Sequence, residues 1–147
     1  MAANPVYNNS GAIAGLNAIL ALLNVGGTGA IKIFTGSAPV STETADTGTL
    51  LVTLTLTNPA FPTAIDNTAG GATATANSIT SGTAGATGTA GYFRSYPHTP
   101  STTNAVIQGT VGTSAADMII NTTAITSGDT VACTAWTVTL PDGSGSD

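Results

Sequence analysis

The side chains that could do chemistry in this chain are few and scattered. His98 is the single histidine, and histidine is the side chain whose ordinary pKa lies nearest to neutral pH. It lies between Pro97 and Pro100, and no nucleophile motif of the Gly-x-Ser-x-Gly type accompanies it. We therefore expect His98 to be an exposed turn residue rather than a general base.

The acidic side chains also lack a pattern that selects a catalytic pair. A glycosidase needs two carboxyl groups held on either side of a bond, and almost all of the carboxylates here fall in expected loops or turns. The seven are Glu43, Asp46, Asp66, Asp117, Asp129, Asp142 and Asp147. We interpret them as solvated loop residues.

Cofactor and metal motifs are missing as well. The sequence contains no phosphate-binding loop lysine, no dinucleotide fingerprint and no cluster of histidine and cysteine with metal-ligand spacing. Cys133 is the single cysteine, has no basic residue near it in sequence, and is expected to be a small buried hydrophobe in a strand. The sequence therefore predicts a protein that is not an enzyme and holds no cofactor.

Positive charge is almost absent. Lys32 and Arg94 are the only lysine and arginine, the formal net charge is -5, and a nucleic-acid partner is not expected. Arg94 lies between Tyr92 and Tyr96 on one face of an expected strand. Its guanidinium either contacts a partner or forms an internal ion pair with a loop aspartate, and the sequence leaves both alternatives open.

Alternating side chains predict the strands that would position these residues. In residues 50–57, Val52, Leu54 and Leu56 alternate with threonines, so one face should be core and the other a row of hydroxyls. Further strands are expected at residues 30–35, 72–79, 89–96, 105–111, 118–122 and 129–140, with a loop at residues 36–48.

One segment, residues 10–24, reads as a helix without a charged side chain on any face, with Ser10 as the N-cap. The run is shorter than the roughly 20 residues that span a bilayer, so a membrane is not expected. A stripe of large residues should face the core: Ile13, Leu16, Leu20 and Leu23. A stripe of small residues should face another chain: Gly11, Ala14, Ala18 and Ala21.

These elements predict an all-β fold, an antiparallel β-sandwich or jelly-roll-like domain with one short N-terminal helix. We expect an extended arm over residues 1–9, the apolar helix over 10–24, the sandwich over 25–143 and a C-terminal tail over 144–147. Val6 and Tyr7 give the arm two apolar anchors, which we add to the expected interface with a partner.

The order of these features resembles a group of small structural proteins of tailed phages and prophages. The resemblance runs from about Ala12 to Gly143 and rests on strands and turns: AILALLNVGGTGAIKIFTGSAP, TLLVTLTLTNPAF, ATANSIT, GTAGYFRSY, VIQGTVGTSAADMIINTTAITSGDTV and TVTLPDG.

This resemblance implies a component of the virion, made in the host cytoplasm. By analogy at the level of the fold, we expect a capsid decoration (cement) protein that binds the outside of a phage capsid and bridges subunits of the major capsid protein. Three copies are expected to meet through the small-residue stripe of the helix. The alternative is a tail or head-fibre module that binds a host receptor or glycan through Tyr92, Tyr96 and His98.

Overall fold

The computed structural model describes residues 5–100 and 104–143, and residues 1–4, 101–103 and 144–147 lie outside the described part. The helical segment consists of α1 (Asn9–Ala21) and a 3-10 turn, η1 (Leu22–Asn24). The strands are β1 (Ala30–Thr35), β2 (Leu50–Leu56), β3 (Ile65–Asp66), β4 (Ala72–Thr75), β5 (Ile79–Thr80), β6 (Gly82–Thr83), β7 (Gly88–Tyr96), β8 (Ile107–Gly112), β9 (Met118–Ile120), β10 (Ala124–Ile125), β11 (Thr130–Val131) and β12 (Cys133–Leu140). The fold is therefore all-β with one N-terminal helix, as the sequence predicts.

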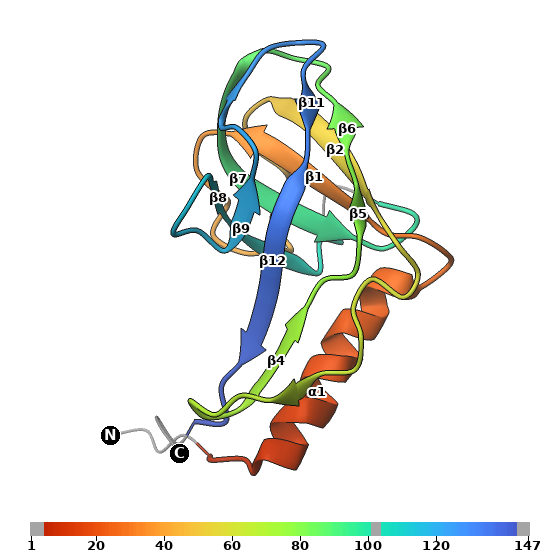
Figure 1. Ribbon diagram of the computed structural model, residues 1–147, viewed down its shortest axis with the longest axis vertical. Coiled ribbons are helices and arrows are strands. Elements are labelled where there is room, and N and C mark those ends of the chain that lie inside the picture. The colour runs from red at the N-terminus through yellow and green to blue at the C-terminus, as the bar shows by residue number, and fades with distance from the viewer. Residues whose placement is uncertain (1–4, 101–103, 144–147) are drawn as a thin grey trace.

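The strands form one long sheet that curls back on itself. Its order is β3-β4-β12-β9-β8-β7-β1-β2-β5, with β10 beside β7 and a separate pair of β6 and β11. Although β4 and β5 follow each other directly in the chain, β4 pairs with β12 and β5 pairs with β2 at the far edge. The two ends of the sheet are thus brought together, which gives the upper part of the molecule its sandwich-like, curled shape (Figure 1).

The core lies inside this curl and beneath the helix. Ile31, Ile33 and Leu54 are fully buried there, as the alternation in β1 and β2 predicts. Trp136 on β12 is nearly perpendicular to Phe61 and to Phe93, with ring centroids 4.8 Å and 5.3 Å apart, respectively. These edge-to-face contacts join β12 to β7 and to the irregular segment before β3.

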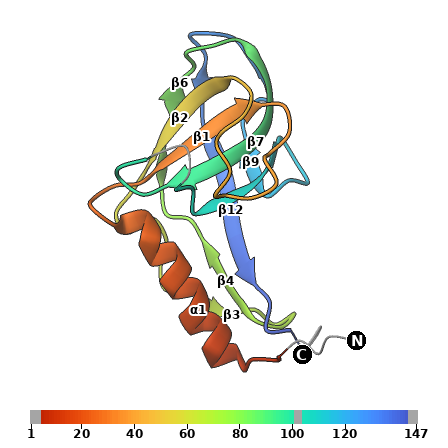
Figure 2. The ribbon, with the colours of Figure 1, turned by 180° about the vertical axis from the view of Figure 1, so that it is seen from behind.

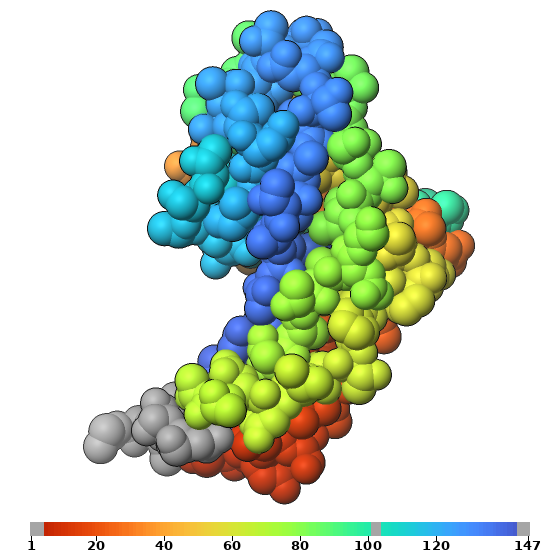
Figure 3. All heavy atoms as spheres, viewed as in Figure 1, coloured from red at the N-terminus to blue at the C-terminus, as the bar shows by residue number. Residues whose placement is uncertain are grey.

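The helix lies at the other end of the molecule, against β3, β4 and β12 (Figures 1 and 3). Two of its polar residues fix the irregular segment that leads to β3. The Asn17 side chain accepts a hydrogen bond from Ala64 N at 2.8 Å, and the Asn24 side chain accepts one from Ala60 N at 2.9 Å. Phe61 is buried between these two tethers.

The helix begins earlier than the sequence suggests. Asn8, not Ser10, is the N-cap, and its side chain accepts a hydrogen bond from Gly11 N at 2.8 Å. Both residue types are good N-caps, so local preference does not choose between them. The expected α-helix over residues 10–24 is also shortened, because its last turn is a 3-10 turn.

Several strand predictions need correction. The expected strand at residues 72–79 is divided into β4 and β5, and the one at residues 129–140 is interrupted at Ala132. A register shift between Cys133 and Ala135 breaks the alternation further. Val131 and Trp136 are both buried, although strict alternation would put positions 131 and 136 on opposite faces. The sheet is not purely antiparallel, because β8 and β9 pair in parallel.

Candidate functional site

The small-residue stripe of the helix faces outwards. Gly11, Ala14, Ala18 and Ala21 are all exposed, whereas Ala12, Leu16 and Leu20 on the opposite side of α1 are buried. Leu23 is buried as expected, and Ile13 is half-buried against the core. The helix therefore contributes one side to the protein's own core and leaves the other uncovered.

This uncovered side carries more apolar surface than the stripe of small residues alone. Leu22 is 51% exposed and Val25, just beyond the helix, is 59% exposed. At about 100° per residue, Leu22 falls about 20° from Gly11 on the same side of the helix, so the helical period could have found it. We call the exposed residues Gly11, Ala14, Ala18, Ala21 and Leu22 the helix face.

The arm continues the helix face at its start. Val6 is 63% exposed and Tyr7 is 57% exposed, so both apolar anchors face away from the core. Tyr7 N donates a hydrogen bond to Asp142 O at 2.8 Å, which ties this part of the arm to the end of the chain. The remainder of the expected arm, residues 1–4, and the expected tail, residues 144–147, lie outside the described residues.

Arg94 is at the centre of a second, buried arrangement. Its side chain is inaccessible to solvent, and its Nη1 lies 2.9 Å from Asp46 Oδ1. The same guanidinium donates hydrogen bonds to the main-chain oxygens of Ser41 and Thr44 and to the Gln108 side chain. Of the two alternatives, the geometry corresponds to the internal ion pair, because a fully buried guanidinium has no surface to offer a partner.

The neighbouring tyrosines take part in the same arrangement. The Tyr96 hydroxyl donates a short hydrogen bond to Asp46, and burial, together with that carboxylate, raises the pKa of Tyr96 well above its usual range. The Tyr92 hydroxyl donates to Thr47 O at 2.6 Å. Lys32 Nζ lies 4.8 Å from the centroid of the Tyr96 ring, a cation–π contact.

Both tyrosines are nearly inaccessible to solvent, so they form no exposed platform for a sugar beside His98. His98 itself is exposed, and its Nδ1 lies 3.2 Å from Thr28 O. Its ring lies against Gly27, where a Cβ would come within 3.1 Å of it. The position of His98 is that of a turn residue, as the sequence predicts.

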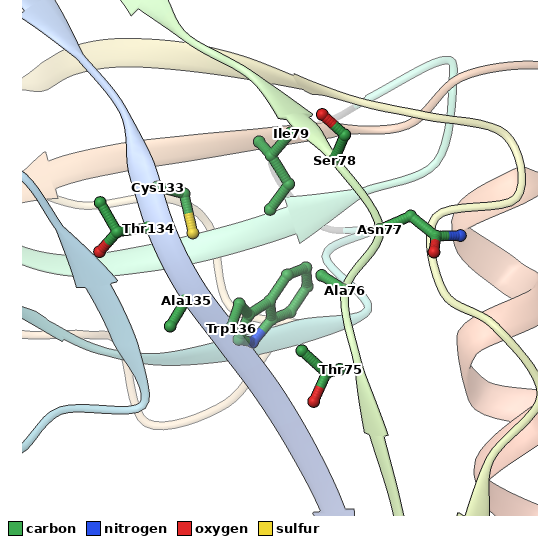
Figure 4. Close-up of a pocket in the computed structure, with 9 residues that line it drawn as sticks. All are labelled: Thr75, Ala76, Asn77, Ser78, Ile79, Cys133, Thr134, Ala135 and Trp136. Carbon is green, nitrogen blue, oxygen red and sulfur yellow. The ribbon is translucent and has the colours of Figure 1, made fainter.

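A hollow of about 280 Å³ lies between β12 and the segment that joins β4 to β5 (Figure 4). Its walls carry Ala76, Asn77, Ser78, Thr134 and Ala135, with the Trp136 ring between the two strands. None of its nine lining residues is charged: Thr75, Ala76, Asn77, Ser78, Ile79, Cys133, Thr134, Ala135 and Trp136. Burial raises the pKa of the Cys133 thiol, which disfavours the reactive thiolate. The hollow thus lacks an acid, a base or an activated nucleophile.

The exposed carboxylates serve local structure. Asp117 accepts hydrogen bonds from Thr110 N and Thr110 Oγ1, each at 2.8 Å, and Asp129 accepts one from Thr126 N at 2.8 Å. Within residues 5–100 and 104–143, no group of three or more histidine, cysteine, aspartate or glutamate side chains could hold a metal ion. In the same part of the chain, no helix has the length and apolar character needed to cross a membrane.

Comparison of the chain with protein-family models, with curated proteins and with solved structures finds no significant match. The functional argument therefore depends on the two features described above. One is the uncovered helix face, and the other is the loop held by Arg94.

Proposed function

We propose that this protein is a structural subunit of a phage particle and acts by binding rather than by catalysis. In this proposal, copies associate through the helix face, with three copies around one axis, and the assembly binds the outside of the capsid. There it bridges subunits of the major capsid protein and stabilises the shell. The sequence resemblance to phage structural proteins supports the virion part of the proposal.

The observation that carries the proposal is the exposed, uncharged side of α1. About a quarter of the residues in a typical soluble domain are charged, yet α1 and η1 contain no charged residue at all. A helix that is apolar on all sides is normally covered on all sides. Here one side is left in water, and covering it would remove apolar area from solvent.

The small side chains suit a close contact between two backbones. Gly11, Ala14 and Ala18 follow at helical spacing and project little beyond the main chain, so a second helix can approach closely. Leu22 and Val25 at one end and Tyr7 at the other would supply larger apolar contacts at the margins. In a ring of three copies, each helix would contact the helices of its two neighbours around the axis through different sides of the helix face.

A glutamate at position 18 tests this contact. Ala18→Glu leaves the folded monomer nearly unchanged, because Ala18 is exposed, but it places an unpaired carboxylate inside the assembled contact. We expect the dissociation constant to rise at least about 100-fold in sedimentation velocity, which corresponds to about 2.7 kcal/mol. The melting temperature measured by circular dichroism should stay close to that of the wild type.

The matched control is Ala69→Glu, which makes the same change in an exposed turn between β3 and β4. It should sediment like the wild type. If Ala18→Glu also sediments like the wild type, the helix face is not the contact. If the wild type is monomeric at every concentration tested, self-association is wrong altogether.

The fibre-type alternative is less well supported by the structure. Its proposed binding residues included Tyr92 and Tyr96, and both side chains are buried beneath the loop between β1 and β2. His98 alone does not make a glycan site.

A further inference from the structure

A second surface of the molecule is formed by a loop whose main chain is held by several side-chain hydrogen bonds. Residues 36–49, here called the β1–β2 loop, contain no helix or strand and lie across the outer side of β1 and β7, on the flank of the curled sheet and away from α1 (Figure 2). Loops of this length without secondary structure are uncommon in compact domains and are often functional. This loop is also firmly held.

Buried and half-buried side chains beneath the loop bind its main chain at successive points. Gln108 Nε2 donates to Pro39 O at 2.8 Å, and Arg94 donates to Ser41 O at 2.7 Å and to Thr44 O at 2.6 Å. Tyr92 then binds Thr47 O. Because the loop is already ordered in the folded protein, little conformational entropy is lost when a partner binds it.

The loop holds one large apolar side chain out into solvent. Val40 is 96% exposed, the highest value among the large hydrophobic side chains of the described residues. Its two neighbours, Pro39 and Ser41, are the anchored residues, so the backbone on both sides of Val40 is fixed. Valine has few rotamers, so its side chain loses little conformational entropy when it enters a pocket.

The charge beside Val40 indicates what kind of surface it would meet. Glu43 on the same loop is exposed, whereas Asp46 is neutralised by Arg94. Among the described residues, a second copy of the chain offers little positive charge to place opposite Glu43. Its only arginine is buried in that ion pair, and its only lysine, Lys32, lies over the Tyr96 ring.

We propose that the β1–β2 loop is the surface that docks on the capsid shell, with Val40 entering a small apolar pocket of the major capsid protein and Glu43 pairing with a lysine or arginine beside it. This inference rests on the proposed function. It assigns contact with the shell to the loop and leaves the helix face, on a different part of the molecule, for contact between copies. The exposed carboxylate of Glu43, on a chain of net charge -5, favours such a basic partner over another copy.

The test uses empty shells assembled from the major capsid protein that the same phage or prophage encodes, mixed with the full-length chain and pelleted. Val40→Asp and Glu43→Lys should each weaken binding to the shell at least about tenfold. The first places a charge in the apolar pocket, and the second sets like charges against each other. Both positions are exposed, so the melting temperature of each variant should match the wild type.

Two control variants make the same kinds of change elsewhere on the surface. Ile65 and Asp66 form β3, and both are exposed. Ile65→Asp and Asp66→Lys should therefore bind the shell within about twofold of the wild type. If the wild type binds but Val40→Asp and Glu43→Lys bind equally well, the loop is not the docking surface, and the proposed function still stands. If the wild type does not bind the shell, both the inference and the capsid-binding function are wrong.

Discussion

Replacing Arg94 by methionine should release the β1–β2 loop and destabilise the whole protein. Methionine keeps much of the aliphatic volume but removes every donor of the guanidinium. Asp46, whose side chain is 13% exposed, would lose its ion pair, and the carbonyls of Ser41 and Thr44 would lose their donors. A carboxylate left in this environment without its cation must be hydrated again, and this requires the loop to detach.

The size of the effect follows from the burial of the pair. Removing one partner of a buried ion pair costs about 3–5 kcal/mol. At about 2–4 °C per kcal/mol for a chain of this size, the melting temperature should fall by about 6–20 °C. The loss of unfolding free energy is limited by detachment of the loop, because water can then donate hydrogen bonds to the carbonyls that Arg94 binds in the wild type.

Urea denaturation followed by fluorescence of the single tryptophan, Trp136, measures the free energy of unfolding. Hydrogen exchange of the amides in residues 36–49 shows whether the loop is released. The matched control is Lys32→Met, which removes the other cation of the chain, and it should cost no more than about 1 kcal/mol because only a cation–π contact is lost. A loss below about 1 kcal/mol for Arg94→Met, with unchanged exchange in the loop, would refute the reasoning.

Two further predictions concern positions near this loop. Because burial and Asp46 raise the pKa of Tyr96, the unfolded chain loses this proton near pH 10 while the folded chain keeps it. The free energy of unfolding should therefore be unaffected by Tyr96 below about pH 10 and fall above it, by up to about 1.4 kcal/mol per pH unit. Tyr96→Phe should show a shallower fall between pH 9 and 11 in urea titrations, and parallel curves would contradict the assignment. Gly91→Ala should prevent stable folding, since its Cβ would lie 1.8 Å from Gly36 O, whereas Gly85→Ala, with open space around it, should change the melting temperature little; a normally folded Gly91→Ala would show that β7 can move away from the start of the loop.

Local patterns in the sequence predict the regular elements well. The alternation in β2 places Val52, Leu54 and Leu56 in the core and Thr53 and Thr55 outside, as the structure has them. The two sides of α1 also follow from the helical period. In both cases the residues that determine the pattern are neighbours in the chain, so no long-range contact has to be known.

Other features depend on contacts between distant segments, and the sequence does not reveal them. The division of β4 from β5 follows from their pairing with β12 and with β2, which are far from them in the chain order or in the sheet. The interruption at Ala132 and the register shift after Cys133 likewise reflect the change of partner from β6 to β9.

The loop and its anchors show the same limit at the candidate site. Arg94 lies about 50 residues from Ser41, Thr44 and Asp46 in sequence, so its role could be narrowed to two alternatives but not decided. Val40 carries no signal of its own in the sequence. Its exposure becomes significant only in the structure, where Gln108 and Arg94 hold the main chain on either side of it by hydrogen bonds.

The location of the protein on an intact particle tests the central claim most directly. Particles from the phage or prophage that encodes the chain can be labelled with gold-conjugated antibodies against it and viewed by electron microscopy. We expect label over the outside of the head, at many sites on each particle. Label confined to the tail, or particles without any label, would contradict a protein that binds and stabilises the capsid shell.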